Sequence, residues 1–433
     1  MPCRFLLSGL GVRSKSMAGV CACRHRVDLA LGESHRRVRR GLADVGGRDR
    51  LALIALLRLA HALERKEMKR DPRHLLILLV SLLMGLAFAA CATHSPQTGP
   101  IFDCEPEGPA RPICGFQNPE DMVALPGEEA ILVSEYGAMD GGTPGQLVLF
   151  TLDSEERRML FRGGEAKGAK AIWGDPACPG PPSAAFSPHG IHLSERSDGA
   201  HQLLVVQHGG RESIEFFEVE GEGTEFSLAW RGCAVAPEGT WLNSVAATPG
   251  GGFVTTSMMN RLSSEEDLAA AFGSGVASGN VVTWGPEEGY GRLPGSESAM
   301  PNGIEVSADG RLVFLNSSGA GEVQRIVRET GEVQAVAYVA GLDNARWAPD
   351  GRLVVASVPG ESNEDFSICM DLKEGACPIE FQIVAIDPET METEVLYRNG
   401  GPPMGGGTVG LVIGDELFVG SFAGDRILRI ALD

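Results

Sequence analysis

Basic residues are scarce after residue 90. Residues 91–433 carry 20 Lys and Arg against 50 Asp and Glu, whereas residues 1–90 carry 17 against 7. So acidic a body repels phosphates, which excludes nucleic acid as its partner. The same charge suits a soluble protein that attracts cations.

Several motifs of common enzymes are missing as well. The sequence has no HExxH zinc motif, no Gly-x-Ser-x-Gly elbow of a serine hydrolase, and no CxxC or HxxxH spacing typical of zinc sites. Its Gly-rich stretch 400–407 is not followed by GKS or GKT, so it is not a phosphate-binding loop. We interpret it as a flexible loop.

Long helical patterns are rare, and the only convincing one is the short stretch 263–272. The chain instead has 57 Gly and 26 Pro, which favours many short strands joined by tight turns. A turn with Gly or Asp followed by an alternating apolar strand recurs six times, at 125–134, 199–208, 249–256, 308–315, 349–356 and 413–420.

The mean spacing of these copies is close to the roughly 40–50 residues of a four-stranded propeller blade. A second strand follows several copies at once, so each copy is predicted to form the inner hairpin of a blade. One blade cannot bury both faces, but six blades can close into a ring without exposed edges. The sequence therefore predicts an all-β fold, a six-bladed β-propeller, over residues 115–433.

No apolar run reaches the roughly 20 residues that span a bilayer. The run 75–90 has 16 residues and follows Lys69, Arg70 and Arg73, which is typical of a secretory signal. Phe88 to Cys91 is similar to a bacterial lipobox with an unusual first residue, and would make Cys91 a lipidated first residue. The alternative is a plain secretory signal cut nearby.

Met68 begins a normal signal on its own, so we predict a signal peptide at 68–91 and a linker at 92–114. The Arg-rich extension 1–67 is then a mis-assigned start, or else a cytoplasmic tail before a membrane anchor. We expect an exported bacterial protein, either periplasmic or anchored to the outer membrane through Cys91.

Six cysteines follow Cys91, and an even number in an exported chain indicates disulfides. Cys104 and Cys114 are close in sequence, as are Cys369 and Cys377, so each pair could close a loop. Cys178 and Cys233 would then form a long-range bridge. Sequence alone permits 15 pairings of six cysteines, so the connectivity stays open.

The segments that precede the repeats carry side-chain oxygens at equivalent places in four of the six blades. These residues are Glu120 with Asp121, Asn243, Asn302, and Asp343 with Asn344. A single Asn or Asp here would be an ordinary turn residue. Four such positions, in loops expected to face the axis of the ring, match the six to eight hard oxygen ligands that calcium prefers.

An ordered set of motifs over residues 115–432 resembles the paraoxonase/arylesterase family. It comprises Pro119-Glu120-Asp121, Pro188-His189-Gly190-Ile191, Leu203 to His208, Leu242-Asn243, Asn302-Gly303-Ile304, Asp343-Asn344 and Gly407-Thr408-Val409. The specificity lies in the order of the whole set, because any one piece is weak evidence.

The resemblance implies a catalytic calcium held by Glu120, Asn243, Asn302, Asp343 and Asn344, with the histidine pair His189 and His208 above it. His192 and His201 have no family role and are expected on the surface. A second calcium is implied at Asp121 and the carbonyl of Ile191. Its third family ligand is an Asp, but Ser244 stands here without a charge, which puts this second ion in doubt.

The resemblance implies a calcium-dependent hydrolase of lactones or esters. Calcium would activate the carbonyl, His189 would take a proton from water with His208 as a relay, and Asp343 is an alternative base or nucleophile. One alternative is a gluconolactonase-type hydrolase of sugar lactones. Another is a propeller that only binds, without catalysis. The expected partner is a small lactone or ester.

Overall fold

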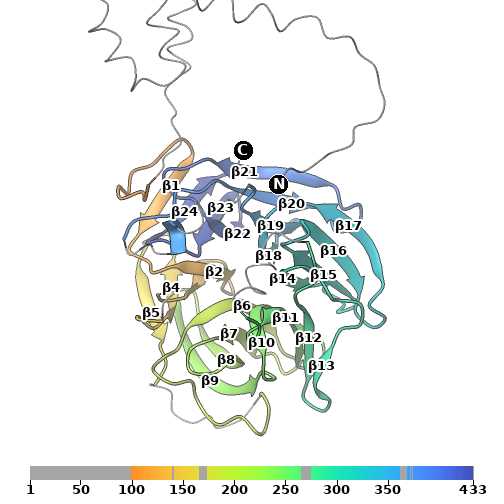
Figure 1. The fold of residues 1–433 in the computed structure, drawn as a ribbon. Coiled ribbons are helices and arrows are strands. Elements are labelled where there is room, and N and C mark those ends of the chain that lie inside the picture. Colours follow the sequence, from red (N-terminus) through yellow and green to blue (C-terminus); the bar gives the residue numbers. More distant parts are fainter. Residues whose placement is uncertain are drawn as a thin grey trace, which may run out of the picture. The chain divides into compact units, whose positions relative to one another are not determined.

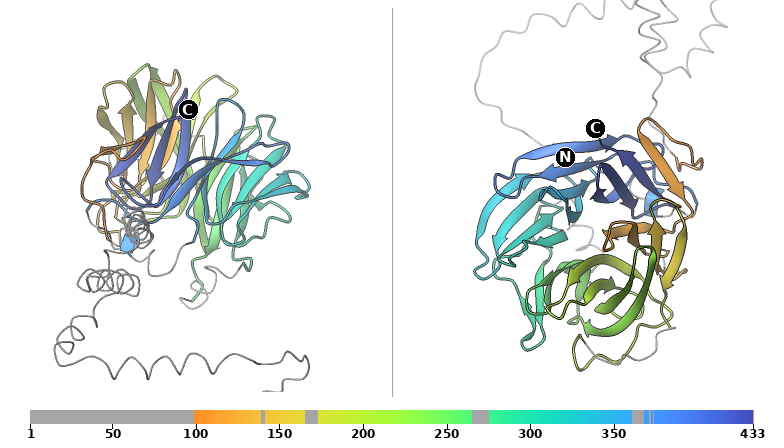
Figure 2. Two further views of the ribbon diagram at one scale, coloured as in Figure 1. Left: turned by 90° about the horizontal axis from the view of Figure 1, so that it is seen from above. Right: turned by 180° about the vertical axis from the view of Figure 1, so that it is seen from behind.

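A computed structural model describes residues 99–138, 141–164, 173–264, 275–360, 368–370, 372 and 374–432. They form six four-stranded antiparallel sheets arranged like blades around one axis (Figure 1, Figure 2). The prediction of an all-β six-bladed propeller is confirmed. In five of the six sheets the strands follow chain order from the axis outward, and in the sixth the first strand of the propeller takes the outer position. The strand that begins each blade is innermost.

Blades 1 to 3 are built from the first half of the described chain. Their strands are β2 (Pro119–Ala124), β3 (Ala130–Glu135), β4 (Gln146–Thr151) and β5 (Arg157–Phe161); β6 (Pro188–Glu195), β7 (His201–Gln207), β8 (Ser213–Glu222) and β9 (Glu225–Val235); and β10 (Thr240–Thr248), β11 (Gly252–Asn260), β12 (Asn280–Gly285) and β13 (Gly289–Arg292).

Blades 4 to 6 follow in the same order. Their strands are β14 (Pro301–Val306), β15 (Leu312–Ser317), β16 (Glu322–Val327) and β17 (Val333–Tyr338); β18 (Leu342–Trp347), β19 (Leu353–Ser357), β20 (Phe381–Ile386) and β21 (Thr393–Asn399); and β22 (Gly407–Ile413), β23 (Glu416–Ser421), β24 (Arg426–Ala431) and β1 (Ala110–Cys114). The six sequence repeats correspond to the second strand of each blade.

The last blade is completed by the first strand of the propeller. β1 pairs antiparallel with β24, from Ala110 opposite Ile430 to Cys114 opposite Arg426. We had placed residues 110–114 in the linker, which is wrong at this boundary, because these five residues are the outer strand of blade 6. Pairing the two ends of the domain closes the ring and covers the edge of β24.

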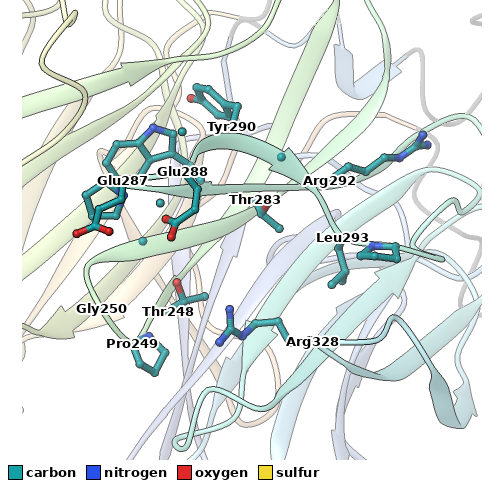
Figure 3. A pocket seen from close by; sticks show the side chains of 17 residues that line it. Thr248, Pro249, Gly250, Thr283, Glu287, Glu288, Tyr290, Arg292, Leu293 and Arg328 are labelled. Atoms are coloured by element: carbon teal, nitrogen blue, oxygen red, sulfur yellow. The ribbon is translucent and has the colours of Figure 1, made fainter.

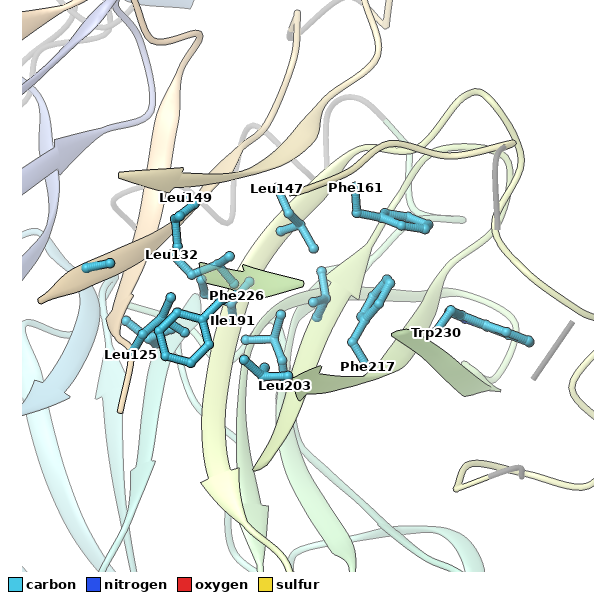
Figure 4. Packing of buried hydrophobic residues seen from close by; sticks show 14 of the residues in the cluster. Leu125, Leu132, Leu147, Leu149, Phe161, Ile191, Leu203, Phe217, Phe226 and Trp230 are labelled. Atoms are coloured by element: carbon cyan, nitrogen blue, oxygen red, sulfur yellow. The ribbon is translucent and has the colours of Figure 1, made fainter. Parts of the chain in front are cut away.

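Six hydrophobic clusters lie in the described chain between neighbouring blades, one at each blade boundary, and a smaller seventh surrounds the Cys369–Cys377 pair. Figure 4 shows the cluster between blades 1 and 2, where Leu132 and Leu149 face Ile191, Leu203 and Phe217. Successive residues of a strand point to opposite faces. In β3, Leu132 joins this cluster while Ile131 and Val133 join the cluster against blade 6. Both faces of each blade are therefore buried.

Each of the six innermost strands has a break in its pairing register near its first residues. The breaks lie between Pro119 and Asp121, Pro188 and Ile191, Leu242 and Val245, Pro301 and Ile304, Leu342 and Ala345, and Gly407 and Val409. These are β-bulges, with one residue more on the inner strand than on its partner. A bulge re-aims side chains that regular pleating would direct elsewhere.

Three disulfides join Cys104 to Cys114, Cys178 to Cys233 and Cys369 to Cys377. This is the connectivity that sequence proximity favoured. The predicted extension 1–67, the signal 68–91 with Cys91, and most of the stretch 263–272 lie outside the described residues and stay predictions. Within the described part of the chain, no helix is long and apolar enough to cross a membrane.

Candidate metal and catalytic site

The predicted calcium ligands lie at four of the six bulges. Glu120 is in β2, Asn243 in β10, Asn302 in β14, and Asp343 with Asn344 in β18. We expected them in loops ahead of the blades, which is wrong, because the segments ahead of the repeats are themselves the innermost strands. The bulges explain how strand residues can still direct polar side chains toward the axis.

Glycines next to the bulge residues allow neighbouring blades to approach closely. A Cβ atom on Gly190 would lie 2.5 Å from the carbonyl oxygen of Asn243, and one on Gly303 would lie 2.4 Å from that of Asp343. Real Cβ atoms do not come so near to a carbonyl oxygen. Positions 190 and 303, directly after His189 and Asn302, therefore require glycine. The bulge of β6 is thus packed directly against that of β10, and the bulge of β14 against that of β18.

Polar side chains also connect three of the bulges to the blade beside them. The hydroxyl of Thr256 donates to the carbonyl of Asn302 at 2.6 Å, and the amide of Asn316 donates to the carbonyl of Asp343 at 2.5 Å. The hydroxyl of Thr408, at the bulge of blade 6, donates to the carbonyl of Glu120 at 2.6 Å. These bonds fix the backbone of the candidate ligands across blade boundaries.

Glu120 contacts candidate site residues from two other blades. Its Oε1 accepts a hydrogen bond from Asn344 Nδ2 at 2.7 Å and lies 3.4 Å from His189 Nε2. The structure thus brings Glu120, Asn344 and His189 into direct contact, although they come from blades 1, 5 and 2. Asn243, Asn302 and Asp343 occupy the equivalent positions on their blades, and the side chain of Asp343 is half-buried.

Buried oxygens without a hydrogen-bond partner are concentrated among these residues. Of eight such side-chain oxygens in the described chain, four are Oε2 of Glu120 and Oδ1 of Asn243, Asn302 and Asn344. A buried polar atom without a partner is costly and calls for an ion or a water. One carboxylate and three amide carbonyls are hard oxygen donors, so the residues present fit a calcium ion.

The ligand set differs from a zinc-type site. Among the described residues, no three His, Cys, Asp or Glu side chains come together as metal ligands. The candidate ligands are mainly amides, with carboxylates only from Glu120 and Asp343.

The histidine pair extends the site toward blade 2. His189 Nδ1 lies 2.8 Å from His208 Nε2, and His208 Nδ1 lies 3.0 Å from both carboxylate oxygens of Glu212. An ionised carboxylate can only accept, so it places a proton on His208 Nδ1 and leaves His208 Nε2 as an acceptor. His189 then donates from Nδ1, and its Nε2 carries the lone pair that faces Glu120.

The two histidines differ in their affinity for protons. Burial alone would lower the pKa of His189, but the carboxylate of Glu120, with smaller effects from Asp121 and Glu212, raises this pKa above its usual value. Burial lowers the pKa of His208, and His189 and Arg261 lower it further against the opposing effect of Glu212. Of the pair, His189 is therefore the stronger base and His208 stays neutral.

Sequence reasoning missed three residues of this site. Glu212 follows His208 by four residues in the loop to β8, and its Oε1 also accepts the amide of Leu242 at 2.7 Å. Arg261 pairs with Glu212 at 3.3 Å and lies over the ring of Trp241. Tyr136 packs edge-on against His189, with ring centroids 5.2 Å apart. The only signal readable in the sequence was Glu212, a carboxylate four residues after the candidate histidine His208.

Neither unassigned histidine belongs to this group. His192 was expected on the surface, which is wrong, because its side chain is only 18% exposed and its Nε2 lies 3.5 Å from Glu305 Oε2. His201 begins β7 and is half-buried, whereas His208 follows the other end of that strand.

The position predicted for a second calcium holds the guanidinium of Arg346. Its Nη2 donates to both Asp121 Oδ2 and the carbonyl of Ile191, the latter at 2.6 Å. Ser244, the uncharged third position, has a buried hydroxyl without a partner. The residues around Asp121 therefore do not fit a second ion, because a cationic side chain already contacts both predicted ligands.

A pocket of about 570 Å³ lies elsewhere on the propeller. It is lined by Thr248, Glu287, Glu288, Tyr290 and Arg328, among others (Figure 3). Thr248 ends β10, whereas Asn243 lies near its start. A second hollow of about 300 Å³ is bordered by Asn118, which directly precedes β2. None of the predicted ligands or histidines lines either pocket.

No family model matches the chain, and no curated protein matches it. Solved structures similar to it include a luciferin-regenerating enzyme, at 14% identity and TM-score 0.45 over 74% of this chain and 95% of that one. A calcium-binding protein, regucalcin, from Agrobacterium tumefaciens has 13% identity and TM-score 0.41 over 73% and 91%. A gluconolactonase from Xanthomonas campestris has 13% identity and TM-score 0.39 over 76% and 99%. Likeness at this level does not extend to activity.

Proposed function

We propose that this protein is a calcium-dependent hydrolase of lactones or esters, similar to the paraoxonase/arylesterase family. One observation carries the proposal. Among the described residues, four buried oxygens without partners lie at equivalent bulges of blades 1, 3, 4 and 5, and one of these residues, Glu120, lies 3.4 Å from His189, the first member of the chain His189, His208 and Glu212. A hard-cation site next to an oriented general base suits the hydrolysis of a carbonyl compound.

Glu120, Asn243, Asn302, Asp343 and Asn344 would hold the calcium. When bound, it would polarise the carbonyl of the substrate and stabilise the negative charge that develops on its oxygen. Asn344 also holds Glu120 Oε1 in place, so that Oε2 remains directed away from this hydrogen bond.

His189 is the general base of the proposed reaction. Its Nε2 takes a proton from the attacking water as the new C–O bond forms, and the positive charge on its ring is stabilised by His208 Nε2. When the C–O bond of the lactone or ester breaks, the leaving alkoxide takes this proton from His189. The products are a carboxylic acid and an alcohol, joined in one molecule for a lactone.

Glu212 acts through His208. It fixes the tautomer in which His208 accepts from His189, and its own position is fixed by the amide of Leu242. Glu212 is thus a positioning residue. Asp343 remains the alternative base or nucleophile, because a carboxylate at the same bulge as Asn344 would reach both the ion and the substrate.

The proposed setting is outside the cytoplasm of a bacterium. Three disulfides support export, because such bonds persist in oxidising compartments. The predicted signal at 68–91 supports the same conclusion, with anchoring through Cys91 or release into the periplasm.

Metal analysis combined with a substrate panel tests the function. The purified protein is assayed for bound calcium and for hydrolysis of an acyl homoserine lactone, gluconolactone and an aryl acetate, before and after chelation. We expect activity that chelation abolishes and calcium restores. Asn302→Ala should abolish it, whereas His201→Gln, on the far end of β7, should retain it.

The panel also separates the alternatives. Turnover of gluconolactone alone would favour the sugar-lactone hydrolase. Bound calcium without turnover of any substrate would favour a binding propeller. Full lactone turnover by His189→Gln would remove the histidine from the mechanism, while loss of lactone activity with residual turnover of the activated ester would support it.

A further inference from the structure

A second group of charged residues lies beneath the calcium site, and its centre is Arg346. Arg346 follows Asn344 by two residues in β18, and its side chain is only 6% exposed. Asn344 contacts Glu120 and Arg346 contacts Asp121, so both side chains of β18 reach blade 1. Asp121 directly follows Glu120 in β2 and is fully buried.

The guanidinium contacts oxygens from four blades. Nε donates to the carbonyl of Met122 at 3.0 Å, and Nη2 donates to Asp121 Oδ2 and to the carbonyl of Ile191. Nη1 donates to the carbonyl of Ala345 at 2.7 Å and lies 3.4 Å from Glu305 Oε1. These acceptors belong to β2, β6, β14 and β18, so one side chain connects blades 1, 2, 4 and 5.

The acceptors around the guanidinium resemble the ligands of a metal site, with the Arg346 side chain in the place of the cation. Two carboxylates and three carbonyls are the hard oxygens that would otherwise surround a divalent ion. A guanidinium is always charged. An ion bound to Asp121 and Ile191 would touch it, and in a buried site the repulsion between them would be poorly screened.

We propose that Arg346 replaces the second metal ion of the propeller, so that the lower part of the axis is held without metal. The neutral Ser244 agrees with this, since one positive charge faces Asp121 and Glu305 and needs no third carboxylate. Two cross-links then join β2 to β18, namely Glu120 to Asn344 above and Asp121 to Arg346 below. The inference rests on the proposed function only in assigning one calcium to the upper site.

Calcium stoichiometry of purified variants tests the proposal. We expect one ion per chain in the wild type and none in the double variant Glu120→Gln/Asn302→Ala. Arg346→Ala should bind one ion more than the wild type, because removal of the guanidinium frees five oxygens. The extra ion should raise the thermal midpoint of Arg346→Ala on addition of calcium. Arg346→Lys, which keeps the charge, should bind no extra ion.

Arg325→Ala is the matched control, because Arg325 donates to the carbonyls of Pro388 and Glu389 and pairs with no carboxylate among the described residues. It should leave the stoichiometry unchanged. A folded Arg346→Ala protein that gains no ion would overturn the proposal. If this variant does not fold, the double variant decides, since an ion retained there would occupy the lower site beside Arg346.

The two proposals fail in different ways. A wild type with two ions overturns the role of Arg346 and leaves the calcium-dependent hydrolase intact. A wild type with no ion and an Arg346→Ala variant with one overturns the upper calcium site while supporting the replacement.

Discussion

The side-chain amide of Asn344 donates a 2.7 Å hydrogen bond to Glu120 Oε1, between strands that are 224 residues apart in sequence. Both residues are buried, and each retains one oxygen without a partner. Asn344 therefore has two roles in the proposed site, because it supplies one oxygen ligand and orients another.

Replacing Asn344 should weaken calcium binding more than the loss of one ligand would. In Asn344→Ala, Glu120 Oε1 loses its donor and the carboxylate is free to rotate. We expect calcium affinity to fall at least about 10–100-fold, measured by calorimetric titration. Asn344→Asp keeps an oxygen but repels Glu120, and should bind calcium yet lose stability when calcium is removed. Unchanged affinity in Asn344→Ala would contradict the ligand assignment.

Glu212 should affect the rate of catalysis rather than the binding of substrate. In Glu212→Gln the amide can donate as well as accept, so His208 is no longer held in one tautomer. We expect kcat to fall about 100-fold with KM nearly unchanged, and Glu212→Asp to recover part of the loss. The matched control is Glu218→Gln, whose carboxylate pairs with Arg231 in the same blade. An equal loss in that variant would mean a structural effect.

The pH at which activity is lost on the acidic side, or acidic limb, of the pH profile should move in opposite directions in two variants. The histidine pair is active when neutral, so activity is present above its apparent pKa and is lost as pH falls through it. Arg261 lowers the pKa of His208 and Glu212 raises it. Arg261→Gln should thus shift the limb of kcat/KM to higher pH, and Glu212→Gln should shift it to lower pH. Shifts of the same sign in both variants would exclude His208 as the coupled partner.

Gly303 should not tolerate even a methyl group. In Gly303→Ala the new Cβ would collide with the carbonyl of Asp343, which is backbone and cannot rotate away. We expect the free energy of unfolding to fall by about 1–3 kcal/mol, with weaker calcium binding because the bulge of β18 is displaced. Gly400→Ala, whose Cβ would meet nothing within 4 Å, should be neutral. Thermal melts with and without calcium measure both effects.

Much of the fold could be predicted because the second strand of each blade carries a local signal, a turn followed by an alternating apolar run. β1 could not be predicted, since β24, with which it pairs, lies more than 300 residues away. Proximity in sequence favoured two of the disulfide pairs and left Cys178 with Cys233, although it did not exclude the other pairings. The bulges could not be predicted, because a single extra residue in a strand produces no repeating pattern in the sequence. The candidate ligands were therefore placed in loops.

The candidate ligands were predictable because each is an Asn, Asp or Glu at the same point of a repeat. Glu212, Tyr136 and Arg261 were not, because they reach His208 or His189 from loops and strand ends whose paths are set by tertiary packing. The sequence did carry a signal for Arg346. It is the one basic residue of β18, an innermost strand whose residues are expected to be buried. Its meaning depended on the acceptors of three other blades.

The pairing of β1 with β24 has a consequence for how the protein is made. β1, the first strand of the propeller to be synthesised, must remain without its neighbour until β24 has been synthesised, and loop closure over such a distance is slow. The ring can therefore close only after β24 has been synthesised. A chain that ended before β24 would leave β1 without its partner and the ring of blades open.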